Sequence, residues 1–214
     1  MNDILMRGPV DWSGDNPFIY LKEDASGPWT CLALYFRIAV SDFGIGKVML
    51  VLENPSEANL GRLTKLCLTD NRQLAKYLID NFVKFYGLFR PFGKILDEID
   101  IVDNAHFLTD TTRTTCHVES ASAADHSIEV SLIWEGLKEP FIVDVPPEKS
   151  QTSRHEMFCV FQPVSSAQVL VGGRKIPGGT VSREFYHGIA QSAALAHSET
   201  WIRKIVPSIV SVTR

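Results

Sequence analysis

The chain has 214 residues, of which 45% are hydrophobic and 21% charged, a composition that excludes a disordered or low-complexity protein. Its formal charge is −4 and no more than two Lys or Arg residues are adjacent, which argues against a nucleic-acid partner. The N-terminus lacks the pattern of a secretory signal, and the longest apolar runs are far shorter than the roughly 20 residues that span a bilayer. We therefore expect a single cytoplasmic domain over residues 1–214 with no membrane partner.

The first half of the chain begins with β-type patterns. Residues 1–17 carry Gly and Pro breaks without periodicity, which predicts an irregular N-terminal arm. Runs rich in aromatic and branched residues, separated by turn signals, then predict three strands in a meander, at 18–23, 29–40 and 47–54.

Helical periodicity follows and predicts a helical pair over about 56–87. Pro55 suits the start of the first helix, in which Leu60, Leu63 and Cys67 recur at helical spacing. The second helix, about 70–87, carries a wide apolar face that includes Leu74 and Leu78, opposite a charged stripe. Such a helix is expected to cover a sheet.

A second β series occupies residues 111–173. The clearest strand is 127–136, whose apolar side chains alternate with polar ones, and 140–145 is expected to pair with it. Gly172-Gly173 and Gly178-Gly179 are spaced as turns between β runs, and no phosphate-binding motif accompanies them.

The last element, about 190–206, has Leu195, Trp201 and Ile202 on one helical face, which favours a C-terminal helix. A final strand is the alternative, because the segment also alternates loosely. The predicted fold class is α+β: a strongly curved, mainly antiparallel sheet or partial barrel of about eight strands, with the helical pair and the C-terminal helix.

A polar cluster lies just before this last element. Arg183, Tyr186 and His187 are expected at the mouth of a ligand pocket, and His187 with Glu184 is the candidate acid–base pair, because a carboxylate can orient and tune an imidazole. The alternative interpretation is an ordinary solvated turn. His197 and Glu199 would share a face only on a strand.

A second polar set lies on the predicted strand near 111–119. Arg113, His117 and Glu119 point to one side, which we expect to face solvent; if it faces the interior, Arg113 and His117 are candidate ligand contacts. The four cysteines are far apart in sequence and without metal-ligand spacing, so we expect separate thiols, no metal and no cofactor.

The aromatic content exceeds what a modest core needs, which favours an apolar cavity between sheet and helices. The function expected first is therefore the binding of a small apolar or amphipathic molecule. The alternatives are an enzyme on the same scaffold, with a His and a carboxylate as its acid–base pair, and a cavity-free homodimeric structural or interaction protein.

Overall fold

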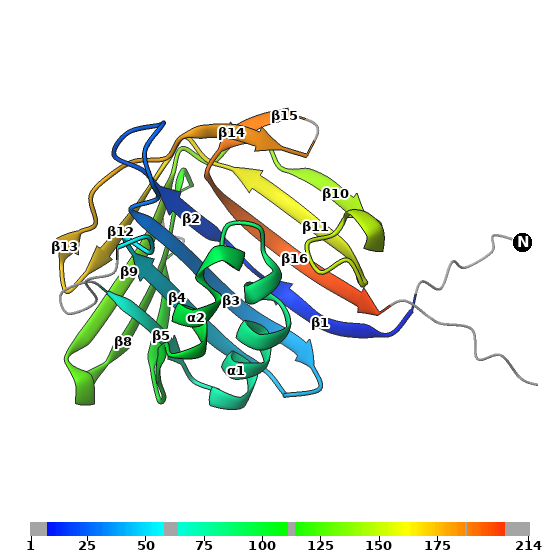
Figure 1. Ribbon diagram of the computed structural model, residues 1–214, viewed down its shortest axis with the longest axis horizontal. Helices are drawn as coiled ribbons and strands as arrows, with labels where there is room; N and C mark the ends of the chain where they lie inside the picture. The colour runs from blue at the N-terminus through cyan, green and yellow to red at the C-terminus, as the bar shows by residue number, and fades with distance from the viewer. Residues whose placement is uncertain (1–7, 58–63, 111–113, 187, 204–214) are drawn as a thin grey trace, which may run out of the picture.

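The computed structural model describes residues 8–57, 64–110, 114–186 and 188–203, and its elements form three layers (Figure 1). A nine-stranded sheet forms the middle layer, with a five-stranded sheet behind it and helices in front. The central strands are β1 (Val10–Asp15), β2 (Phe18–Leu21), β3 (Cys31–Ser41), β4 (Gly46–Glu53), β5 (Lys65–Thr69), β6 (Asp100–Val102), β10 (Phe141–Val145), β11 (His155–Pro163) and β16 (Ala193–Arg203). The second sheet comprises β7 (His106–Asp110), β8 (Cys116–Ala123), β9 (Ile128–Glu135), β12 (Ser166–Val171) and β13 (Arg174–Lys175).

The remaining elements are short. The helical layer consists of α1 (Arg72–Asn81), η2 (Val83–Phe85), η3 (Arg90–Phe92) and α2 (Gly93–Asp97), and further 3₁₀ turns are η4 (Ala124–His126) and η5 (Pro147–Lys149). A separate two-stranded hairpin is formed by β14 (Ser182–Phe185) and β15 (Gly188–Gln191). None of the helices in the described ranges is long and apolar enough to cross a membrane.

The middle of the central sheet is buried on both faces, which is why the first part of β3 is almost continuously apolar. Leu32, Leu34 and Phe36 pack toward the helical layer, whereas Ala33 and Tyr35 pack toward the second sheet. The strand order is β10-β11-β16-β1-β3-β4-β5-β6, with β2 also paired to β16 and β3. Every pairing is antiparallel except that of β5 with β6. The α+β class and a mainly antiparallel sheet are thus confirmed. The single sheet of about eight strands is wrong, because the described strands divide among three sheets, and the partial barrel is not confirmed.

The C-terminal helix predicted over 190–206 is wrong. Residues 193–203 form β16, which lies between β11 and β1 in the middle of the central sheet. Both faces of its first half are buried, because Ala194 and Ala196 join the core under the helices and Ala193 and Leu195 join the core under the second sheet. The polar alternation that marks a half-exposed strand is therefore missing.

The N-terminal arm also differs from the prediction. Residues 10–15 form β1, and β1 and β2 lie one after the other in a single row between β16 and β3. Asn16 and Pro17 interrupt this row. Residues 1–7 lie outside the described part of the chain.

The helical pair is shorter than predicted. Residues 65–69 form β5 at the position assigned to the end of the first helix, and residues 58–63 lie outside the described ranges. The second helix begins after Asn71, whose side chain accepts a hydrogen bond from the Leu74 amide, and α1 ends at Asn81. Its apolar face covers the central sheet as expected.

Candidate functional site

A β-bulge in β16 places one carboxylate on an unexpected face of the sheet. Ser198 has a positive φ of 51°, and the pairing of β16 with β11 shifts register at the same point. The extra residue reverses the alternation of side chains. His197 therefore turns to the Gln162 side of the strand, whereas Glu199 turns toward the helical layer. The two residues share a strand but not a face.

The Glu199 side chain is buried among polar donors from its own sheet. Its Oε1 accepts hydrogen bonds from Trp201 Nε1 at 2.6 Å and from Asn16 Nδ2 at 3.2 Å. Asn16 lies in the interruption between β1 and β2, and from there its side chain reaches the Glu199 carboxylate. Burial raises the pKa of the Glu199 carboxyl to about 7, and the two hydrogen bonds oppose that rise.

Aromatic side chains surround this carboxylate and form what we call the aromatic pocket. It is a small hollow of about 70 Å³ with Asn16 and Glu199 among its lining residues. The aromatic residues that line it are Phe18, Tyr20, Tyr86, Phe161, Phe185, Tyr186 and Trp201. They come from three places: the central sheet, the end of η2 and the β14–β15 hairpin.

A larger hollow, the hairpin groove, lies beside the aromatic pocket between β10 and the β14–β15 hairpin. Its volume is about 690 Å³. Its apolar lining residues are Phe141, Ile142, Val143, Val145, Pro146, Pro163, Phe185, Tyr186, Ile189 and Ala190. Phe185 and Tyr186 line both hollows, so they separate the aromatic pocket from the hairpin groove.

The sequence-predicted polar cluster falls partly at this place. Arg183 and Tyr186 line the aromatic pocket, with the Arg183 guanidinium 6.0 Å from the ring centroid of Tyr20. Glu184 is exposed and pairs with Ile189 across the hairpin, and it is not among the lining residues of the aromatic pocket or the hairpin groove. His187 is outside the described residues, so the His187–Glu184 pair stays a prediction.

In the second predicted polar set, Glu119 is buried and His117 is partly buried, so the expected solvent-facing interpretation is wrong for these two residues. Glu119 is 1% exposed, and its carboxylate contacts His117 Nε2 at 2.9 Å and the Thr109 hydroxyl at 2.8 Å. The reason is that Ala121, two residues further along the same face of β8, belongs to the core between the two sheets. Arg113 lies outside the described residues.

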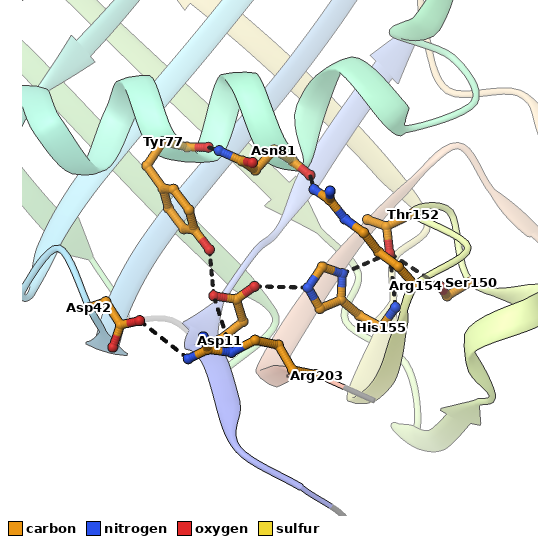
Figure 2. A network of polar contacts seen from close by, with 9 residues as sticks. All are labelled: Asp11, Asp42, Tyr77, Asn81, Ser150, Thr152, Arg154, His155 and Arg203. Atoms are coloured by element: carbon orange, nitrogen blue, oxygen red, sulfur yellow. Dashed lines mark hydrogen bonds and ion pairs between the residues drawn. The ribbon is translucent and has the colours of Figure 1, made fainter. Parts of the chain in front are cut away.

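A third polar network ties β1 to β11 and α1 (Figure 2). Asp11 accepts from Tyr77 at 2.5 Å and bonds His155 Nε2 at 2.8 Å, while His155 Nδ1 contacts the Thr152 hydroxyl at 2.9 Å. Since a carboxylate only accepts, Nε2 carries the proton in the neutral ring and Thr152 donates to Nδ1. Both ring nitrogens are occupied, and His155 is 4% exposed. We infer that this network holds the sheet and helix together.

Replacing His155 with alanine is expected to lower the free energy of unfolding by about 3 kcal/mol, because it leaves the Asp11 carboxylate buried without its main partner. Thr152→Val removes the hydroxyl that bonds His155 Nδ1, accepts from the His155 backbone amide and contacts the Ser150 hydroxyl, but it leaves the Asp11–His155 contact in place. It should cost about 1–1.5 kcal/mol. Urea denaturation measures both. Equal losses in the two variants would contradict the assignment of Asp11–His155 as the main contact.

The same network has a defined acid dependence. Burial raises the pKa of Asp11, but the hydrogen bonds from His155 and Tyr77 outweigh that effect and leave the pKa below its ordinary value. A lowered folded-state pKa means that the stabilisation is present above the unfolded pKa, about 3.9, and is lost as pH falls through the folded value.

Neither the aromatic pocket nor the Asp11 network has the composition of a metal centre. Among the described residues, no three His, Cys, Asp or Glu side chains gather in one place. The cysteines are separate thiols, and burial raises the pKa of Cys31, Cys67 and Cys159.

Comparison of the chain with protein-family models found no matching family. Comparisons with curated proteins and with solved structures found no match either.

Proposed function

We propose that this protein binds a small apolar or amphipathic molecule, with the apolar part in the hairpin groove and the polar end in the aromatic pocket. The observation that carries the proposal is that the two hollows are neighbours, because Phe185 and Tyr186 form a wall shared by both. A volume of about 690 Å³ is within the range of small-molecule sites, which are mainly apolar with a few polar groups that fix orientation. Glu199, Asn16 and Arg183 are those polar groups here.

The location differs from the sequence expectation in one respect. Most of the interface between the helical layer and the central sheet is filled by buried side chains such as Leu74, Leu78 and Phe82. The aromatic pocket lies at the end of this interface, where Tyr86 meets the hairpin. The proposal therefore places the ligand under the β14–β15 hairpin and not beneath α1.

A thermal-shift screen with medium-chain fatty acids, isoprenoid alcohols and acyl-CoAs tests the proposal. A ligand at 100 times its Kd stabilises the folded state by about 2.7 kcal/mol. For a chain of this size that corresponds to a rise in Tm of roughly 5–10 °C. No shift with any apolar ligand would contradict the proposal.

A matched pair of variants at Gly188 locates the site. Gly188 pairs with Phe185 across the hairpin, so a side chain at 188 points to the groove side, and a Cβ there meets no atom within 4 Å. Gly188→Trp is expected to fill the groove and weaken binding at least tenfold, whereas Gly188→Ala should bind as the parent does. Calorimetric titration of the best ligand from the screen measures both; equal binding by all three proteins would place the site elsewhere.

An enzyme that uses the same pocket is the second candidate function. The observation in its favour is that the pKa of Glu199 lies at about 7, where a carboxyl can act as acid or base at neutral pH. Mass spectrometry of each bound ligand recovered after prolonged incubation separates the two functions. Conversion that is lost in Glu199→Gln supports an enzyme, and an unchanged ligand supports a binding protein.

Self-association through the groove is the third alternative. Ile142 and Ile189, both at the groove, are 66% and 79% exposed. An apolar surface of this kind can also bind a second copy of the chain. Sedimentation velocity over a range of protein concentrations distinguishes ligand binding from self-association. The proposed ligand site requires an open groove, whereas a dimer formed through the groove would close it.

A further inference from the structure

The floor of the aromatic pocket offers hydrogen-bond acceptors that the described residues leave unused. Asn16 is 5% exposed, and its Oδ1 is buried without a partner in the described part of the chain. The Asn16 amide nitrogen is already engaged, since it donates to Glu199 Oε1 and to the Tyr86 hydroxyl. Of the Glu199 carboxylate, only Oε1 is bonded by described residues. A buried acceptor without a donor is costly, so a ligand that brings donors gains affinity here.

The walls of the pocket favour a positive charge. Aromatic faces attract cations, most strongly where water is excluded. The Arg183 guanidinium already lies 6.0 Å from the Tyr20 ring centroid at one side of the pocket. Glu199 is the one carboxylate among the lining residues of this pocket in the described ranges. A donor-bearing cation in this pocket would therefore meet the Glu199 carboxylate, an unused acceptor and aromatic faces, with Arg183 as the one like charge among the described lining residues.

We propose that the ligand carries a protonated primary or secondary amine, which binds between Glu199 and Asn16 Oδ1, with its apolar tail in the hairpin groove. This inference rests on the proposed function, because it names the polar end of the same ligand. The aromatic pocket, at about 70 Å³, has room for an ammonium group and its first methylene but not for a bulky head. The tail then passes Phe185 and Tyr186 into the groove.

Binding of such a cation is coupled to the ionisation of Glu199. The titratable groups that face this carboxyl are Asp15, Tyr20, Tyr86, Cys159 and Tyr186, and Arg183 lines the same pocket. Burial raises the pKa of the three tyrosines and of Cys159, so these groups are neutral near pH 7. A bound ammonium group draws the Glu199 proton off, and affinity for the amine should increase from pH 6 to pH 8.

Three probes with the same tail test the inference on the full chain: n-octylammonium, n-octanol and n-octanoate, titrated calorimetrically at pH 7.5. We expect n-octylammonium to bind at least tenfold more tightly than the other two. Glu199→Gln should weaken binding of n-octylammonium at least tenfold and so remove that preference. Arg183→Gln should leave the preference for the amine in place or increase it.

Two sets of results would overturn the inference while leaving the proposed function standing. These are equal binding of amine and alcohol, and preferred binding of n-octanoate that Arg183→Gln abolishes. Binding of none of the three probes would count against the proposed function itself. A further measurement needs no variant. Titration of the parent protein with n-octylammonium at pH 6.5, in buffers of different ionisation enthalpy, should show a net release of protons. If no protons are released, the proposed contact with Glu199 is contradicted.

Discussion

Replacing Glu199 with glutamine is expected to raise the free energy of unfolding at pH 8 by up to about 3 kcal/mol. Burial raises the pKa of this carboxyl from 4.5 to about 7, and each pKa unit corresponds to about 1.4 kcal/mol. At pH 8 the folded protein must hold an ionised carboxylate in an aromatic pocket. Glutamine keeps an oxygen that can accept from Trp201 and Asn16 but carries no charge.

The sign of the pH dependence follows from the same shift. Between pH 4.5 and about 7 the folded state binds more protons at Glu199 than the unfolded state does. Stability therefore falls as pH rises through this window, and the loss is complete above the folded pKa. In Glu199→Gln this fall should disappear.

Urea denaturation at pH 5, 6, 7 and 8 measures the effect, with Glu184→Gln as a control that removes an exposed carboxylate from the neighbouring hairpin. In the control, the free energy of unfolding should change with pH as it does in the parent protein. Two results would contradict this prediction: a Glu199→Gln protein that is less stable than the parent at pH 8, or one whose free energy of unfolding changes with pH as the parent's does. Either would show that burial does not disfavour the ionised carboxylate.

Trp201→Ala is expected to lower the free energy of unfolding by about 3–5 kcal/mol, because a large buried ring is lost and a cavity remains. Trp201 is 2% exposed. Its ring centroid lies 5.3 Å from that of Phe82 and 6.0 Å from those of Tyr86 and His155. The residue thus joins the helical layer, the central sheet and the Asp11 network.

Trp201→Phe separates packing from hydrogen bonding. Phenylalanine keeps much of the ring contact but lacks the Nε1–H that donates to Glu199 at 2.6 Å. The cost in stability should be well below that of alanine, and the pKa of Glu199 should rise further because a donor to the carboxylate is lost. NMR titration of the Glu199 carboxyl measures the pKa. An equal stability loss in the two variants would mean that the hydrogen bond, and not the packed ring, holds this region.

Several strands could be predicted because their pattern is local. The aromatic and branched run at 29–40 corresponds to β3, and the alternating run at 127–136 corresponds to β9. Gly172 and Gly173, both with positive φ, make the two-residue turn between β12 and β13 as predicted. In each case neighbouring residues specify the conformation.

For β16 the sequence offered the strand only as the alternative to a helix, because its conformation is set by distant partners. Alanines at 193, 194 and 196 suit a helix by intrinsic propensity. Their pairing with β11 and with β2 overrides that preference. Small residues also suit a strand that is covered on both faces, and this requirement becomes visible only when the layers are known.

The candidate site was found in part. Arg183 and Tyr186 were expected at a pocket mouth because polar residues gather before the last element, and they do line the aromatic pocket. Their role as ligand contacts stays a prediction. Glu199 and Asn16 were missed because the bulge at Ser198 reverses the face of Glu199, and because the contact joins residues 183 positions apart.

The position of β3 has a consequence for hydrogen exchange. Residues 31–36 of β3 are paired along both edges and covered on both faces, so their amides should exchange with solvent only through global unfolding. Within the described ranges the β14–β15 hairpin pairs with no other strand, so its amides should exchange through local opening at much lower free energy. A ligand held between the hairpin and β10 would oppose this local opening. It should therefore slow amide exchange in the hairpin by far more than the increase in global stability alone would predict.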